Sequence, residues 1–169
     1  MTLWTLLAAT AAGLGLAAGG TLLLPRQVHV ERQATLAAPA DTILALAASN
    51  TGYQRFNPYL SADPRLQITP FGPDTGIGSG FRFDGKDGKG SQTVAAVTPT
   101  SVRYDIDLGA MGRPVQQIAA EPVAEGTRVT WSMEMDIGFN PMARVFGLFM
   151  DRMVGQTFEQ GLENLAAAT

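Results

Sequence analysis

Residues 127–165 read TRVTWSMEMDIGFNPMARVFGLFMDRMVGQTFEQGLENL and contain two elements in direct succession. In the first, apolar residues alternate with polar ones from Val129 to Met135, the period of a half-buried strand. Asn140 is a good N-cap and Pro141 suits the first helical position. The residues after Pro141 predict one long amphipathic helix, because apolar side chains recur near three- and four-residue spacing. These are Val145, Phe149, Met153, Phe158, Leu162 and Leu165.

Upstream of this stretch, short strand patterns are separated by turn residues. The predicted strands cover 27–36, 66–71, 81–83, 91–98, 101–108, 114–121 and 127–137. Turns such as Asp84–Gly90 and Pro99-Thr100 are short, so neighbouring strands should be antiparallel. Ala38-Pro39-Ala40-Asp41 should open a helix after the first strand, and Tyr53–Pro58 a second, short one. The pattern predicts an α+β domain in which the last helix covers one face of an antiparallel sheet.

The N-terminal segment has the properties of a membrane anchor. Thr2–Leu24 carries no charged side chain and, as a helix, would span roughly 34 Å. We therefore expect residues 1–25 to form a single transmembrane helix, with the positive-inside rule weakly favouring a cytoplasmic domain. A cleaved signal peptide ending near Ala17-Ala18-Gly19 is the competing interpretation. The small residues Ala11, Gly15 and Gly19 form a stripe that would support a weak homodimer in the membrane.

Composition excludes several functions. The chain of 169 residues has a net charge of −3 and no basic run, which argues against a nucleic-acid partner. It has no cysteine and one histidine, so zinc–thiolate sites, thiolate nucleophiles and multi-histidine metal sites are excluded. The glycine-rich stretches 76–80 and 88–91 lack the helix context of phosphate-binding loops. We predict no metal site, no cofactor and no catalytic constellation.

A resemblance to a known superfamily follows from particular residues. Residues 136–141 (DIGFNP), Arg144, Phe146-Gly147, Asp151, Gly155 and residues 158–162 (FEQGL) resemble the START-like or SRPBCC superfamily. Val30-Glu31-Arg32 and Ala38-Pro39 are similar to the start of such domains. The resemblance is to the bacterial polyketide cyclase/dehydrase-like subgroup with an N-terminal membrane helix, although this chain lacks basic residues before that helix. It implies a helix-grip fold over residues 26–169, with a sheet wrapped around the C-terminal helix and an apolar cavity between them.

The candidate ligand site is the set of large side chains that should face this interior. The expected cavity-lining residues are Phe81, Phe83, Tyr104, Ile106, Trp131, Met133, Met135, Phe149 and Met153. Tyr104 would need a polar partner for its hydroxyl, either structural or from a ligand. His29 and the pairs Asp105/Asp107 and Glu134/Asp136 should lie on the solvent face of their strands.

Three functions are consistent with this site. The first is a membrane-anchored protein that binds a hydrophobic small molecule or lipid. The second is a cyclase- or dehydratase-type enzyme using Tyr104, and the third is a co-chaperone-like interaction module with a filled interior and an exposed apolar patch.

Overall fold

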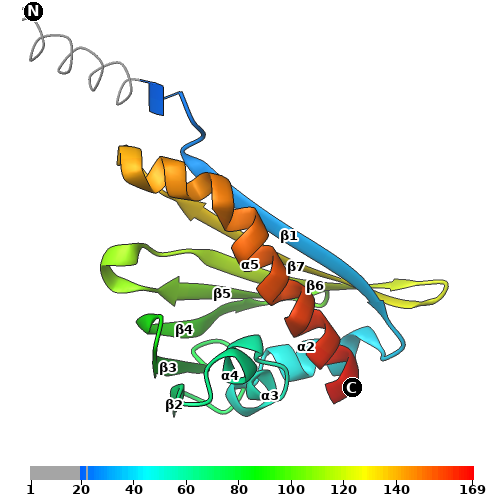
Figure 1. The fold of residues 1–169 in the computed structure, drawn as a ribbon. Coiled ribbons are helices and arrows are strands. Elements are labelled where there is room, and N and C mark those ends of the chain that lie inside the picture. Colours follow the sequence, from blue (N-terminus) through cyan, green and yellow to red (C-terminus); the bar gives the residue numbers. More distant parts are fainter. Residues whose placement is uncertain (1–19, 22) are drawn as a thin grey trace, which may run out of the picture.

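A computed structural model describes residues 20, 21 and 23–169 as one sheet with helices on one side (Figure 1). The strands are β1 (Gln27–Leu36), β2 (Gln67–Phe71), β3 (Gly80–Gly85), β4 (Gly88–Val97), β5 (Ser101–Asp107), β6 (Val115–Val123) and β7 (Gly126–Asp136). The helices are α2 (Ala40–Ala47), α3 (Asn50–Gln54), α4 (Pro58–Ala62), the 3-10 turn η1 (Gly109–Met111) and α5 (Pro141–Ala168).

The seven strands form a single antiparallel sheet in the order β1-β7-β6-β5-β4-β3-β2. Strands β2 to β7 each pair with their neighbour in sequence, as expected from their short turns. The first strand departs from this pattern and pairs with the last, placing Val30 opposite Met133 and Arg32 opposite Trp131. The chain therefore enters the sheet at one edge, beside the strand that leads into α5.

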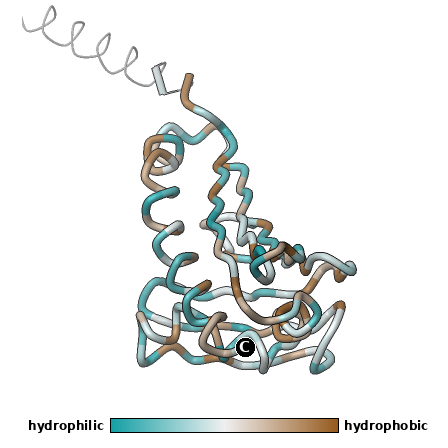
Figure 2. The backbone as a smooth tube through the Cα atoms, turned by 90° about the vertical axis from the view of Figure 1, so that its right-hand side faces the viewer, coloured by the Kyte–Doolittle hydropathy of each residue, from teal (hydrophilic) through white to brown (hydrophobic). Residues whose placement is uncertain are grey.

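Several helices share the inner face of the sheet. The long helix α5 packs mainly on β1 and β7, whereas α2 packs on β6 and β5. Helix α3 contacts α2, and helix α4, which follows α3, contacts α5. Figure 2 shows α5 as a separate layer beside the sheet, with the more hydrophobic turns in its upper half. The inner face of the sheet is therefore covered by several helices, and α5 covers mainly the part formed by β1 and β7.

Helix α5 begins where the sequence predicts. The Asn140 side chain accepts hydrogen bonds from the backbone nitrogens of Met142 (3.0 Å) and Ala143 (3.4 Å), and Pro141 follows it. Two glycines let α5 approach the sheet closely, since a Cβ at Gly155 would meet the Arg32 guanidinium and one at Gly161 would meet Trp131.

Arg32 ties the middle of α5 to the edge strand. Its guanidinium lies 2.9 Å from the Asp151 carboxylate and 2.7 Å from that of Glu159. The Arg32 side chain is 24% exposed, so two carboxylates compensate a partly desolvated charge. These hydrogen bonds and charges raise the pKa of Arg32 and lower that of Asp151.

The segment between β1 and β2 differs from the prediction of one short helix over Tyr53–Pro58. It contains two helices instead, α3 and α4. Ser49 caps α3 by accepting from the Gly52 nitrogen at 3.1 Å, and Asn57 caps α4 by accepting from the Tyr59 nitrogen at 3.0 Å. Each cap starts a new helix, so Tyr53–Pro58 spans the junction between them.

The predicted membrane anchor lies almost entirely outside the described residues. The same is true of Ala11, Gly15 and Gly19, the predicted dimer stripe. Within the described part of the chain, no helix is both long and apolar enough to cross a bilayer. The anchor and the stripe therefore stay predictions.

Candidate functional site

Aromatic rings fill the centre of the predicted cavity. Trp131 is fully buried and stacks on Phe158 with the ring centres 4.9 Å apart. The Tyr53 ring lies 5.6 Å from that of Tyr104 and 6.1 Å from that of Trp131, and Phe56 lies 5.8 Å from Trp131. Where Trp131 and Tyr104 are expected to line an open cavity, the space is instead filled by the rings of Tyr53 in α3 and of Phe56 in the turn after it.

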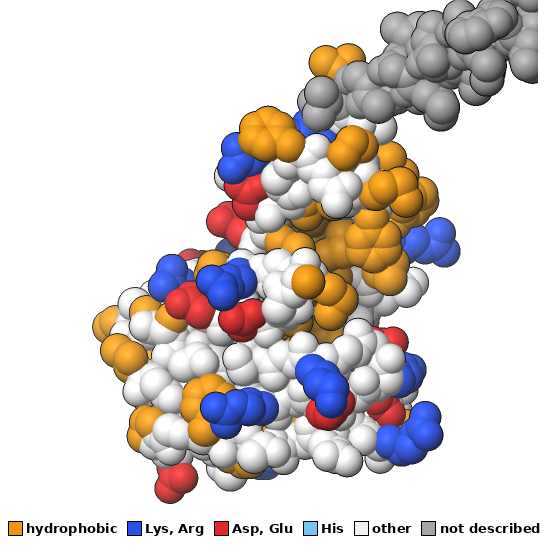
Figure 3. All heavy atoms as spheres, turned by 90° about the vertical axis from the view of Figure 1, so that its left-hand side faces the viewer, with side chains coloured by type: hydrophobic (Ala, Val, Ile, Leu, Met, Phe, Trp, Pro, Cys, Tyr) orange, Lys and Arg blue, Asp and Glu red, His pale blue; other side chains and the backbone are white. Residues whose placement is uncertain are grey.

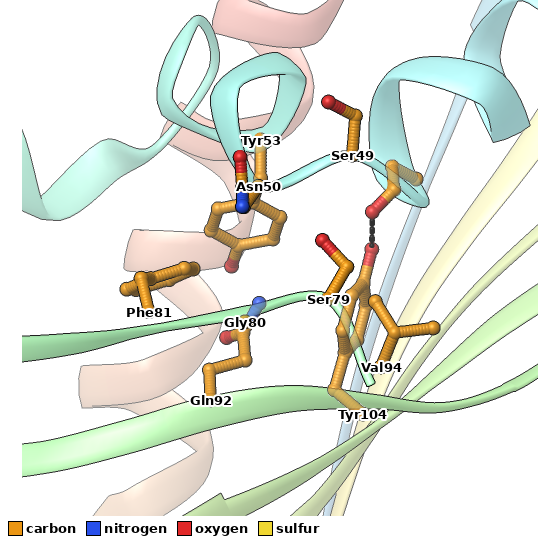
Figure 4. A pocket seen from close by; sticks show the side chains of 10 residues that line it. Ser49, Asn50, Tyr53, Ser79, Gly80, Phe81, Gln92, Val94 and Tyr104 are labelled. Atoms are coloured by element: carbon orange, nitrogen blue, oxygen red, sulfur yellow. Dashed lines mark hydrogen bonds between the residues drawn. The ribbon is translucent and has the colours of Figure 1, made fainter. Parts of the chain in front are cut away.

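A small polar hollow remains beside these rings (Figure 4). It has room for about 10 Å³, the space of a single water molecule. Its polar lining comes from α3, the loop before β3 and strand β4, and includes Asn50, Ser79 and Gln92. Among the described residues, the buried Asn50 Oδ1 has no hydrogen-bond partner. A lone buried acceptor of this kind suits a bound water.

Tyr104 has a structural partner. Its hydroxyl donates to the Ala47 backbone oxygen at 2.8 Å, at the end of α2 (Figure 4). Burial raises the pKa of Tyr104 well above its ordinary value, and burial likewise raises the pKa of Tyr53. Both phenols therefore stay protonated and can act as hydrogen-bond donors.

The first half of α5 carries its apolar side chains in the open. Phe149 and Met153, expected to lie over Trp131 and Met133 in the interior, are 59% and 53% exposed. The physical reason is that α5 contacts the sheet through a different face. That face carries Gly147 beside Val28, and Asp151 and Gly155 beside Arg32.

Another side of α5, distinct from the face that contacts the sheet, carries Phe146, Met153 and Asn164. Phe146, Met153 and Asn164 are separated by seven and eleven residues, so they lie on one side of the helix. Asn164 donates to the Phe56 backbone oxygen, which places this side toward the turn between α3 and α4. This side therefore overlooks the part of the inner face that α5 does not touch. On the face shown in Figure 3, hydrophobic side chains gather in a hollow in the upper half of the molecule.

The inner face of the sheet supplies the other apolar side chains of this region. Met133 and Ile106 are buried, whereas Met135 and Phe83 are half-buried. Phe81 is buried against the Tyr53 ring at 5.4 Å and belongs to the packed centre. We give the name open groove to a set of apolar side chains and propose that they line one hollow: Phe149, Met150 and Met153 of α5, with Met133, Met135, Ile106 and Phe83 of the sheet. Sequence analysis missed Met150 of α5, Tyr53 of α3 and Phe56 of the turn that follows α3.

The polar residues considered from the sequence lie on the outer surface, as predicted. Asp105 and Glu134 are exposed, and His29 is 57% exposed with its ring nitrogens 3.7 Å from Glu31 and Glu134. A hollow of about 140 Å³ lies at this edge, between the start of β1 and α5, lined by Val28, His29, Arg144 and Leu148 among others. Over the described residues, no cluster of three or more His, Asp or Glu side chains could hold a metal ion.

Comparison with known proteins identifies the family. Residues 27–169 match the model of the family described as polyketide cyclase / dehydrase and lipid transport. The chain belongs to this family. The match covers every strand and helix listed above, so the superfamily suggested by the DIGFNP and FEQGL motifs is confirmed. A comparison with curated proteins found no significant match.

Solved structures share the fold at low sequence identity. KanY, solved in solution by NMR, is 17% identical over 83% of this chain and 96% of its own, with a TM-score of 0.63. StfQ, a di-domain ARO/CYC protein from the steffimycin biosynthetic pathway, is 13% identical, with a TM-score of 0.61. That match covers 83% of this chain and 50% of StfQ. A protein from Chromobacterium violaceum is 16% identical over 85% of this chain and 96% of its own, with a TM-score of 0.58. The sheet with its long terminal helix is thus the helix-grip fold.

Proposed function

We propose that this protein is a membrane-anchored binder of a hydrophobic small molecule or lipid, which it holds in the open groove. The observation that carries the proposal is the exposure of the large apolar side chains Phe149 and Met153 on the first half of α5. Large apolar side chains that remain exposed together are unfavourable in water and are typical of a surface that binds a partner. The family description, which includes lipid transport, supports the same class of ligand.

The chemistry of the groove suits an apolar and adaptable ligand. Four methionines contribute long, polarizable side chains that can repack around different shapes, namely Met133, Met135, Met150 and Met153. Arg32, beside the middle of α5, is already paired with Asp151 and Glu159. An acyl chain or fused-ring hydrocarbon would therefore meet mostly carbon and sulfur.

The proposed anchor would hold the groove near its source of ligand. Thr2–Leu24 contains no charged residue and is long enough to cross a bilayer. It precedes β1 by only a few residues, so a membrane-inserted segment would keep the domain at the surface. We propose a single-pass location of the type found in bacterial inner membranes, with the domain on the cytoplasmic side.

Photo-crosslinking tests the groove directly. The full chain is placed in phosphatidylcholine vesicles containing a lipid with a diazirine in its acyl chain, and crosslinked residues are mapped by mass spectrometry. Crosslinks to Met133, Met135 or Ile106 are expected, because these strand residues form the groove floor. Crosslinks restricted to residues 1–25 and to the start of α5 would contradict the proposal, since the surrounding bilayer alone could produce them.

Met153→Glu is the decisive variant. A carboxylate facing an acyl chain should reduce the strand crosslinks about tenfold or more, because an unpaired charge is costly in an apolar site. Ala166→Glu is the matched control, since Ala166 is exposed on the same helix near its C-terminal end. Crosslinks to residues 1–25 provide an internal standard and should be equal in both variants.

A cyclase- or dehydratase-type activity is a second candidate, favoured by the buried polar hollow. Tyr53, Gln92, Ser79 and Asn50 offer hydroxyl and amide groups there, but the hollow has no carboxylate or imidazole in its lining. Protonated phenols could orient a carbonyl group of a substrate without removing a proton from it. Conversion of a captured polyketide-like compound by wild type, lost in Tyr53→Phe, would support this candidate over simple binding.

An interaction module is the third candidate, and the filled interior with an exposed apolar patch favours it. The same crosslinking experiment separates it from ligand binding. A protein-docking surface would leave the groove floor without acyl crosslinks.

A further inference from the structure

Four exposed apolar residues stand together where the chain enters the domain. Leu23, Phe139, Met142 and Val145 are 90%, 70%, 78% and 41% exposed, and we refer to them as the apolar tip. They come from the segment before β1, from the β7–α5 loop and from the first turns of α5. The tip is separate from the groove residues Phe149 and Met153, which lie further along the helix.

Hydrogen bonds and an ion pair connect the tip to residues 24–26, which follow the predicted anchor. Arg144 donates to the Leu24 backbone oxygen at 3.0 Å, and the Ile137 nitrogen donates to the Arg26 backbone oxygen at 3.0 Å. The Arg26 side chain pairs with Asp136 at 2.6 Å. Residues 24–26 are therefore held against the residues that flank the tip.

Two arginines hold Phe139 in its exposed position. The guanidinium carbons of Arg26 and Arg144 lie 5.2 Å and 5.5 Å from the centre of its ring. These cation–π contacts stabilise an orientation that exposes most of the ring. Aromatic side chains with adjacent arginines are typical of the boundary between a bilayer and water.

The length of chain outside the described residues indicates which partner covers this tip. If Thr2–Leu24 crosses the bilayer, Leu24 lies at the interface, and Arg26 follows within about 7 Å of extended chain. The headgroup region on each side of the hydrocarbon core is roughly 5–7 Å thick. The tip is bonded to residues 24–26 and so falls at the depth of that region.

We infer that the apolar tip rests in the headgroup region of the bilayer and turns the open groove toward the lipid. This inference rests on the anchor in the proposed function, and it concerns different side chains from those of the groove. Both lysines, Lys86 and Lys89, lie in the β3–β4 hairpin rather than at the tip. Of the two arginines at the tip, Arg26 is paired with Asp136, and Arg144 donates to the backbone oxygens of Gly138 and Leu24. Docking should therefore be mainly apolar and should not require anionic lipid.

Depth-dependent quenching tests the inference on the full chain. The chain has no cysteine, so Met142→Cys or Val145→Cys gives a single site for an environment-sensitive fluorophore. The labelled protein is reconstituted in pure phosphatidylcholine vesicles with or without lipid carrying a doxyl quencher near its headgroup. Ala166→Cys is the control, because Ala166 is exposed near the far end of α5.

Labels at positions 142 and 145 should lose emission in quencher-containing vesicles, while the label at 166 should not. If the protein floats with the vesicles but all three labels stay unquenched, the inference is overturned and the anchor stands. If the protein does not float with the vesicles, the anchor and the inference fail together. Energy transfer between labelled copies, without quenching by lipid, would assign the tip to a second copy and would also overturn the inference.

Discussion

The Tyr104 hydroxyl could stabilise the fold or contact a ligand, and a single substitution distinguishes the two roles. Its hydroxyl donates to the Ala47 oxygen in a buried environment, so Tyr104→Phe leaves that carbonyl without its partner. We expect the free energy of unfolding to fall by about 1–3 kcal/mol, measured by urea denaturation. Acyl crosslinks to the groove should not change. Loss of those crosslinks with unchanged stability would instead place the hydroxyl on a ligand.

Asp136 makes the junction between β1 and α5 sensitive to acid. A side-chain hydrogen bond from Arg26, helped by a backbone hydrogen bond from Gly138, lowers the pKa of Asp136 to about 2. The pKa in the unfolded chain is about 3.9, so this carboxylate stabilises the fold above pH 4 and loses its effect as the pH falls toward 2.

The melting temperature of Asp136→Asn should therefore lie below that of wild type at neutral pH, and the difference should shrink between about pH 4 and pH 2. Asp105→Asn, which removes a carboxylate from the outer face, controls for the loss of one surface charge. A difference that grows on acidification would show that Asp136 does not act through its ionised form.

Close approach of helix and sheet determines how α5 responds to substitution. A Cβ at Gly161 would press on the Trp131 ring, which is already stacked on Phe158 and cannot move aside. Gly161→Ala should lower the free energy of unfolding by about 1–3 kcal/mol through overpacking.

Gly147→Ala is the matched substitution on the same helix. Its Cβ would lie 2.8 Å from Ile137 Cδ1 and 3.2 Å from Val28 Cγ2, both at the ends of side chains that can shift. Alanine favours a helix over glycine, so stability should be unchanged or rise by up to about 1 kcal/mol. Equal losses in both variants, measured by urea denaturation, would mean that Trp131 does not limit the approach of α5.

At the level of elements, the strands and the start of α5 could be predicted because their signals are local. Alternation from Val129 to Met135 and the pair Asn140-Pro141 depend on neighbouring residues alone. The pairing of β1 with β7 could not be predicted from such patterns, since it joins residues about 100 positions apart. The positions of Phe149 and Met153 were also missed, because apolar spacing defines a helix face without saying what that face contacts.

The same limit explains the error about the cavity. The predicted inward set is apolar, yet its centre is filled by Tyr53 of the short helix α3 and by Phe56 of the turn after it, both in a segment with weak sequence signals. The predicted residues that remain outside this packed centre are those of the open groove: Phe83, Ile106, Met133, Met135, Phe149 and Met153. Sequence alone therefore predicted which strand residues face the interior, but not how much open space remains between them.

For the whole molecule, the proposed anchor, apolar tip and open groove form one arrangement at the end where the chain enters the sheet. In Figure 1 the first turns of α5 and the start of β1 lie together at that end, while the C-terminus lies at the opposite one. A ligand could then pass from the bilayer to the groove along the exposed apolar side chains of α5. The packed core around Trp131 would remain intact during this exchange.

Native mass spectrometry of the detergent-extracted full chain tests ligand binding most directly. The account predicts a co-purifying apolar molecule, bound one to one in wild type and in Ala166→Glu, and lost from Met153→Glu while that variant keeps its fold. Wild-type protein that carries no such molecule, and takes up none when a lipid extract is added, would contradict it.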